Sequence, residues 1–183
     1  MSEQHISKEE YRRIYEALDK VSPVVFDCGR FCGAACCDVE TYSDMGMYLL
    51  PGEEAVHDRS DNCFEWDVDD AEDLDFPPSW KGEVYFIRCR GSRFCDRKKR
   101  PIQCRTYPVA PHLTEDGKLV LVYSDMEVPY VCPMIASEAE FSTAFLKETH
   151  SAWKILIRDR RIYDLVESAS RYRGDGVTFL YGE

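Results

Sequence analysis

Apolar side chains recur at helical spacing in the first part of the chain. Segment 1–22 carries apolar residues at positions i, i+3, i+4 and i+7, the pattern of an amphipathic helix; they are Tyr11, Ile14, Tyr15 and Leu18. Ser7 and Glu10 have the spacing of a capping box, in which each side chain bonds the backbone N–H of the other residue. Pro23 stops the pattern. The sequence therefore predicts an N-terminal helix within 1–22.

Residues 137–173 predict two C-terminal helices. Ser137 and Glu140 again match a capping box, and the apolar residues after them share one helical face: Phe141, Phe145, Ala152, Trp153 and Leu156. A second helix is expected from about Asp159, because apolar residues then return at helical spacing: Ile162, Leu165, Val166 and Ala169. The run 177–181 predicts an edge strand after these helices.

Short strands are expected between the terminal helices. Residues 84–87 are apolar and rich in aromatic and β-branched side chains, which favours a strand. Asp116 and Gly117 form a turn signal between two apolar runs and predict a β-hairpin. With 183 residues, the chain has the length of one domain. We therefore expect an α+β fold, a single small domain over 1–183, with irregular cysteine-rich segments, flanking helices and a short β-hairpin.

The middle of the chain changes the sign of its charge. Residues 53–75 hold eleven acidic residues against the single Arg59, which predicts a solvated loop or an acidic flap. Residues 81–105 hold nine basic residues against two acidic ones. We expect the acidic insert 53–75 to fold over this basic segment and to pair with its basic run, 97–100.

The overall charge narrows the classes of partner. Lys and Arg number 23 against 34 Asp and Glu, which gives a net charge of −11. Such a field disfavours binding to nucleic acid or to an anionic membrane surface. Apolar runs are too short to cross a bilayer, and from the first residues we expect no secretory signal. The sequence thus predicts a cytoplasmic protein with no membrane or nucleic-acid partner, and it identifies no protein partner.

Nine cysteines are the unusual feature of the composition. Eight of them fall in two groups within the cysteine-rich region 28–132: Cys28, Cys32, Cys36 and Cys37, then Cys89, Cys95, Cys104 and Cys132. In a reducing compartment, clustered cysteines are typical of metal sites, with disulfides and inert buried thiols as alternatives. Eight thiols exceed the four ligands of one mononuclear site. Either two sites exist or several of these thiols only pack.

Individual residues in these groups have different expected roles. Adjacent Cys36 and Cys37 cannot easily chelate the same ion, so they supply two sites or one of them only supports a site. Cys63 stands alone in the acidic insert and is not expected to be a ligand. Arg105 follows Cys104 directly, and a neighbouring cation lowers a thiol pKa and offsets thiolate charge. A surface salt bridge with the acidic insert is the alternative role of Arg105.

The cysteine pattern resembles the YkgJ-type cysteine-cluster family, whose domain is described as zinc- or iron-chelating. Two motifs in the same order carry the resemblance, Cys28-x3-Cys32-x3-Cys36-Cys37 and Arg100-Pro101-Ile102-Gln103-Cys104-Arg105-Thr106-Tyr107-Pro108. The match covers roughly 28–108, and Cys132-Pro133 extends it. The acidic insert, Cys63 and Cys89 depart from the family pattern.

The resemblance implies binding of Zn²⁺ or an iron–sulfur cluster through the matching cysteines, Cys28, Cys32, Cys36, Cys37, Cys95 and Cys104. Flagellin lysine N-methylase is similar over the same cysteine pattern. That similarity implies an alternative, a metal-dependent enzyme of methyltransferase-like or redox type that uses the same cluster. We expect a metal-binding protein, with the enzyme as the second hypothesis.

Overall fold

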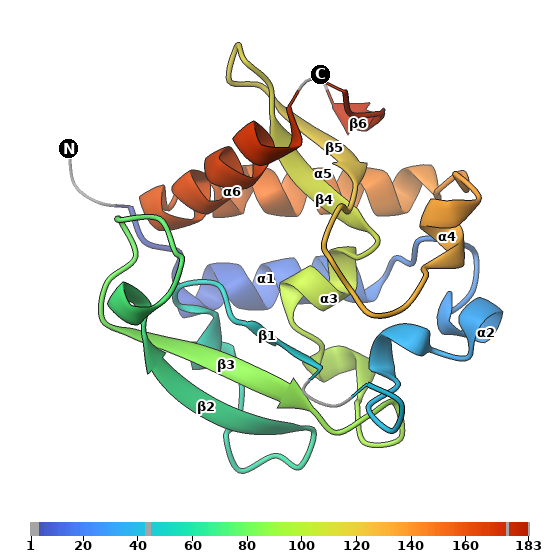
Figure 1. Cartoon of the computed structure of the whole chain (residues 1–183), viewed down its shortest axis with the longest axis horizontal. Coiled ribbons are helices and arrows are strands. Elements are labelled where there is room, and N and C mark those ends of the chain that lie inside the picture. Colours follow the sequence, from blue (N-terminus) through green and yellow to red (C-terminus); the bar gives the residue numbers. More distant parts are fainter. Residues whose placement is uncertain (1–3, 43–44, 175, 183) are drawn as a thin grey trace.

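The computed structural model describes residues 4–42, 45–174 and 176–182, and it has an α+β architecture (Figure 1). The helices in this part of the chain are α1 (Lys8–Asp19), α2 (Gly29–Cys32), α3 (Ile102–Thr106), α4 (Pro133–Ala136), α5 (Thr143–Leu156) and α6 (Arg160–Arg173). The strands are β1 (Gly46–Tyr48), β2 (Phe64–Asp70), β3 (Glu83–Cys89), β4 (Val109–Leu113), β5 (Leu119–Tyr123) and β6 (Phe179–Gly182). Short 3₁₀ helices are η1 (Ala35–Cys37), η2 (Glu53–Val56), η3 (Ala71–Asp73) and η4 (Arg97–Lys99). The α+β prediction is confirmed.

The N-terminal helix forms as its sequence predicts. The Ser7 hydroxyl accepts a bond from the Glu10 N–H, and the Glu10 carboxylate accepts one from the Ser7 N–H, so the capping box is complete. The apolar face of α1 is buried at Tyr11, Ile14 and Leu18. Residues 1–3 of the predicted segment lie outside the described residues.

The described strands form two separate antiparallel sheets of three strands each. One has the order β1-β3-β2 and the other the order β4-β5-β6 (Figure 1). The hairpin predicted at Asp116 and Gly117 joins β4 to β5, and Gly117 takes the positive φ of 76° that such a turn favours. The predicted strand at 84–87 lies within β3, and the C-terminal edge strand is β6. These three predictions are confirmed.

The main apolar core lies between the long helices and the second sheet. Helix α6 packs on β4, α5 packs on β5 and β6, and α1 packs on α5 and adds its apolar face to the same core; Figure 1 shows α5 running behind β4 and β5. Large side chains at its centre are almost fully buried: Tyr11, Leu18, Ile102, Leu121, Phe145, Leu156 and Ile162. Burial of each is worth about 1.5–3 kcal/mol. None of the helices in the described ranges is long and apolar enough to span a membrane.

The prediction of an acidic loop or flap at 53–75 is wrong. The segment forms η2, then the seven-residue strand β2, which pairs with β3 from Phe64 opposite Cys89 to Asp70 opposite Glu83. The acids of β2 alternate with Phe64, Trp66 and Val68, a period of two that places them on one face of a strand. The high count of acidic residues favoured a loop, although the alternation of acidic and apolar residues is typical of a strand.

Opposite charges do meet across the first sheet and beside it. Asp67 on β2 pairs with Arg88 on β3, and Asp61 pairs with Lys99 of the basic run. The expected attraction between the two segments is therefore present. It acts between the paired strands β2 and β3, and between the loop before β2 and a short 3₁₀ helix, so it contributes to the folded sheet.

The predicted start of the first C-terminal helix is also wrong. Ser137 ends the short helix α4, where its hydroxyl donates to the Pro133 carbonyl oxygen at 2.7 Å, and Glu138 then takes a positive φ of 49°. The long helix α5 begins only after Ser142. A proline at the first helical position favours the extra short helix, because its φ is already helical. The predicted apolar face of α5 is confirmed by burial of Phe145, Ala152, Trp153 and Leu156.

The second C-terminal helix begins where it was expected. Asp159 caps α6, and its carboxylate accepts a bond from the Arg161 N–H at 3.0 Å. Gly174 follows the last residue of the helix with a positive φ of 68°.

Candidate metal centre

The backbone between Cys32 and Cys36 reverses direction within two residues. Gly33 and Ala34 both adopt left-handed conformations, with φ of 61° and 59°. Ala34 carries a Cβ atom, so this conformation costs roughly 1 kcal/mol there. The reversal ends α2 at Cys32 and starts η1 at Ala35. The first four cysteines therefore lie on a short helix and a following tight turn, not on one continuous helix.

Four thiols from two distant parts of the chain line one small cavity. Cys28, Cys32 and Cys36 come from the α2–η1 segment, and Cys132 comes from the residue that precedes α4. Figure 1 shows α2 and α4 at the same end of the molecule. The cavity measures about 20 Å³, and Tyr107 and Tyr130 complete its wall. We call the four cysteines, Cys28, Cys32, Cys36 and Cys132, the first thiol group.

The other four candidate cysteines form a second thiol group, Cys37, Cys89, Cys95 and Cys104. Burial raises the pKa of Cys104, and the nearby thiols of Cys89, Cys37 and Cys95 raise it further. Burial, and to a smaller extent the thiols of Cys37 and Cys95, raise the pKa of Cys89 to about 12. These mutual effects place the four sulfurs within electrostatic range of one another. They come from η1, the end of β3, the next loop and α3.

Cys36 and Cys37 connect the two thiol groups. Their sulfurs are 3.9 Å apart, yet Cys36 lines the cavity of the first group while Cys37 belongs to the second. The contact with Cys36 lowers the pKa of Cys37 to about 7, and the same contact, with burial, raises the pKa of Cys36. Cys104 also raises the pKa of Cys36, so the two groups adjoin.

Arg100 is a cation next to the second thiol group, although it was expected to pair with the acidic insert as part of the basic run 97–100. Burial lowers the pKa of Arg100, but the thiols of Cys95, Cys37 and Cys104 raise it by a larger total amount. Its Nε atom is buried and has no hydrogen-bond acceptor among the described residues. A buried donor beside several thiols suits a site in which those thiols carry negative charge. The sequence feature that could have indicated this role is the position of Arg100 in the Arg-Pro-x-x-Cys motif that contains Cys104.

Arg105 points away from the thiol groups. Its side chain is 4% exposed, and its Nη1 lies 3.1 Å from the Asp19 carboxylate at the end of α1. Its other nitrogens donate to the carbonyl oxygens of Arg100 and Lys98, both at 2.6 Å, and the guanidinium stacks 4.4 Å from the Tyr15 ring centre. Arg105 thus fixes the backbone on which Arg100 sits, and its ion pair is with Asp19 of α1.

Cys63 lies in a different environment from the eight grouped cysteines. It is 4% exposed, packs with Leu49 and Ile87, and donates from its sulfur to the Phe94 carbonyl oxygen at 2.8 Å. Its thiol raises the pKa of Cys95, so it is near the second group, but its hydrogen bond is already made within the protein. The structure places it as a packed core thiol.

A buried carboxylate anchors α3, which carries Cys104. Glu53 is fully buried and accepts hydrogen bonds from the Ile102 N–H at 2.8 Å and the Tyr15 hydroxyl at 2.6 Å. The Tyr15 hydroxyl also lies 2.8 Å from Nε2 of His57. Burial raises the pKa of Glu53, whereas burial and Arg105 lower the pKa of His57 to about 4. His57 therefore hydrogen-bonds within this network and contacts none of the grouped thiols in the described interactions.

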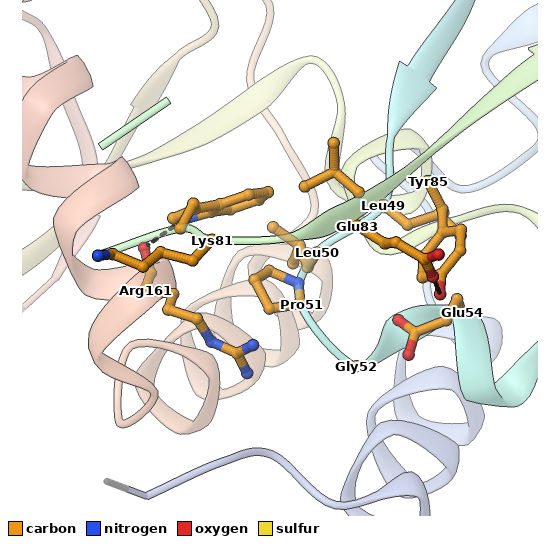
Figure 2. A pocket seen from close by; sticks show the side chains of 11 residues that line it. Leu49, Leu50, Pro51, Gly52, Glu54, Lys81, Glu83, Tyr85 and Arg161 are labelled. Atoms are coloured by element: carbon orange, nitrogen blue, oxygen red, sulfur yellow. Dashed lines mark hydrogen bonds between the residues drawn. The ribbon is translucent and has the colours of Figure 1, made fainter. Parts of the chain in front are cut away.

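A pocket of about 160 Å³ between the first sheet and α6 contains no cysteine. Figure 2 shows Lys81 and Arg161 at one end of it and Glu54 and Glu83 at the other. The indole N–H of Trp80 donates to the Arg161 carbonyl oxygen at 2.8 Å and joins the sheet to the helix. This pocket is separate from both thiol groups.

Neither thiol group is a finished coordination shell. In 4–42, 45–174 and 176–182, no group of three or more His, Cys, Asp or Glu side chains has the arrangement to hold a metal ion. The donor chemistry nevertheless fits zinc or iron, because each group supplies four soft sulfur ligands and the second also has a buried cation beside it. A single zinc ion would draw the sulfurs of a group inward. Compared with protein-family models, curated proteins and solved structures, the chain gives no significant match.

Proposed function

We propose that this chain is a cytoplasmic metal-binding protein whose clustered thiols hold Zn²⁺ or an iron–sulfur cluster at two adjoining four-cysteine sites. One observation carries the proposal: Cys132 and three cysteines of the 28–37 segment meet around one cavity. Nearly a hundred residues separate these segments in the sequence. Packing alone does not require four thiols at one point, whereas a metal does.

The first site would use Cys28, Cys32, Cys36 and Cys132, and the second Cys37, Cys89, Cys95 and Cys104. Assigning one member of the adjacent pair to each site removes the difficulty of chelating one ion with neighbouring residues. In the second site, Arg100 would offset part of the negative charge of four thiolates, and its unpaired Nε would donate to one of them.

Because the pKa values of the buried thiols are raised, protons and metal ions compete for the same sulfur atoms. Burial raises the pKa of Cys89 and Cys104, so both thiols are protonated at neutral pH in the absence of metal. A bound metal supplies the positive charge that keeps these thiols deprotonated. Metal uptake would therefore release protons and weaken as the pH falls.

The size of the first cavity bears on the nature of the metal. About 20 Å³ is room for one water-sized atom. A single zinc ion fits with small movements of the side chains. A four-iron cluster is larger and requires the four sulfurs to move outward.

Metal analysis after anaerobic purification tests the proposal directly. Zinc would be found at about two ions per chain, one for each group of four thiols. An iron–sulfur cluster would instead give a brown protein that contains iron and acid-labile sulfide. Purified protein with neither metal, even after reconstitution under reducing conditions, would contradict the proposal.

Single substitutions then test the assignment of ligands. Cys28→Ser in the first group and Cys104→Ser in the second should each remove about half of the bound metal, because serine replaces a soft thiolate with a hard hydroxyl. Cys63→Ser is the matched control, since it changes a buried cysteine outside both groups and should leave the metal content unchanged. Complete loss in either single variant would indicate one shared centre instead of two sites.

A further inference from the structure

A large cavity next to the thiol region contains no cysteine. It measures about 660 Å³ and is formed by α3, β4, α6 and the loop after β5. Its inner wall is apolar, with Val109, Ala110 and Val166 buried. Three aromatic residues line it as well, Tyr107, Trp153 and Tyr172. A volume of this size, with apolar walls and a few polar groups, is typical of a site for a small organic molecule.

Acidic side chains line the exposed part of this cavity. Asp75, Asp125 and Glu127 are all exposed, and the lining has one basic residue, Arg173. Arg173 is already committed, because its Nε lies 2.6 Å from the Asp125 carboxylate and its Nη1 donates to the Pro111 carbonyl oxygen at 2.9 Å. Asp75 and Glu127 form no ion pair in the described part of the chain. The cavity therefore keeps a net negative charge of two carboxylates.

A buried donor inside the cavity wall also lacks a partner. Trp153 of α5 is 3% exposed, and its indole N–H has no hydrogen-bond acceptor among the described residues. Aromatic faces and carboxylates attract the same kind of ligand, since a cation interacts favourably with both. The exposed Tyr172, at 87%, and Met126, at 52%, leave apolar surface at the opening. The carboxylates and the exposed ring of Tyr172 favour a positive charge on the ligand, and the apolar wall favours an apolar body. The Trp153 N–H is a donor and does not contribute to binding an ammonium group.

We propose that this cavity binds a small organic cation, an alkylammonium group joined to an apolar body of aromatic size. The apolar body fills the inner wall at Val109, Ala110 and Val166. The ammonium group faces the exposed carboxylates of Asp75 and Glu127. These two carboxylates repel an anionic ligand of the same shape, and a neutral ligand gains no charge attraction from them.

The position of the cavity gives the ligand a defined relation to the thiols. Helix α3 carries Cys104 of the second thiol group, and the same helix lines the cavity with Gln103 and Thr106. Tyr107 belongs to the walls of both this cavity and the cavity of the first thiol group. A bound cation would thus lie one residue away from both groups, as the metal-dependent enzyme hypothesis requires of a substrate. The binding proposal itself does not depend on a metal.

Three probes that share one body and differ in charge test the proposal on the full chain: phenylbutylammonium, phenylbutanol and phenylbutyrate. Isothermal calorimetry should rank their affinities in this order. The metal content of each sample is measured separately, so absence of metal and absence of cation binding are distinct outcomes. Equal affinity for the three probes, or no binding of the ammonium probe at millimolar concentration, would overturn the proposal.

Two variants locate the site. The double variant Asp75→Asn, Glu127→Gln should weaken the ammonium probe roughly tenfold, as expected for two exposed charges, and leave phenylbutanol unchanged. Glu115→Gln, which removes an exposed acid in the turn between β4 and β5, is the control and should have no effect. Ala169→Phe, which adds a ring to the α6 side of the cavity, should weaken all three probes. Unchanged ammonium affinity in the double variant would place any binding elsewhere and refute the assignment.

Discussion

The titration of His57 provides a quantitative test of the network that supports α3. His57 lies 2.8 Å from the Tyr15 hydroxyl, which in turn bonds the buried Glu53. Burial, and then the charge of Arg105, lower the pKa of His57 from 6.5 to about 4. The substitution His57→Gln keeps a side chain that can hydrogen-bond with Tyr15 but cannot titrate in this range.

The sign and size of the effect follow from proton linkage. Between pH 6.5 and 4, His57 is protonated in the unfolded chain and neutral in the folded protein, so the unfolded state binds more protons. The free energy of unfolding therefore decreases as the pH falls through this window. At about 1.4 kcal/mol for each pKa unit, the loss attributable to His57 is about 3 kcal/mol.

Urea unfolding of the wild type and the His57→Gln variant, from about pH 7.5 to about pH 4, measures this loss. At neutral pH we expect the wild type to be the more stable protein, because it retains the native ring packing. The difference should shrink, and the stability order can invert, as the pH approaches 4. Glu53 titrates in both proteins, so the difference between the two curves isolates His57. Parallel curves across the window would refute the reasoning.

Three further predictions concern the frame around the site. Burial raises the pKa of Glu53, so ionising it above about pH 4.5 lowers the free energy of unfolding of the wild type. Glu53→Gln removes this titration, and the same urea experiment should show a smaller decrease of stability with rising pH in the variant. Gly46→Ala should lower the stability by about 2 kcal/mol or more, since its Cβ atom would lie 2.4 Å from the Ile87 carbonyl oxygen, and the melting temperature reports it. Deleting 58–73 removes β2 from the first sheet and should abolish the cooperative thermal transition seen by circular dichroism; a normal transition would show that the strand is dispensable.

Local sequence patterns correctly predicted the starts of α1 and α6 and the hairpin of β4 and β5. The capping box at Ser7 and the cap at Asp159 act within one turn of their helices, and both helices begin where these residues predict. The Asp116-Gly117 turn similarly sets the hairpin of β4 and β5. Each of these signals acts between neighbours in the sequence. The same capping-box spacing at Ser137 and Glu140 did not begin a helix, because Pro133 starts the short helix α4 that ends at Ser137.

Elements that depend on distant partners were misread. β2 is a strand because β3 pairs with it, and its acidic face gave no hint of that partner. The roles of two arginines near Cys104 also depended on distant partners: Arg105 was expected beside the thiols or in a surface salt bridge, and Arg100 in the basic run that pairs with the acidic insert. Arg100 faces the thiols and Arg105 reaches Asp19 of α1, a distinction set by how α3 packs against α1 and not by distance along the chain. The eight grouped cysteines were identified from spacing, but their division into two groups of four needed the position of Cys132.

The peptide bond between Cys36 and Cys37 has a thermodynamic consequence for metal uptake. Under the proposed two-site arrangement, ordering the η1 turn around one metal also fixes the direction of the neighbouring thiol for the other. The conformational entropy lost at this turn is then counted once for two binding events, so the second ion binds more tightly than the first. Metal uptake should be cooperative, so a partial titration should give fewer chains with one occupied site than two independent sites would.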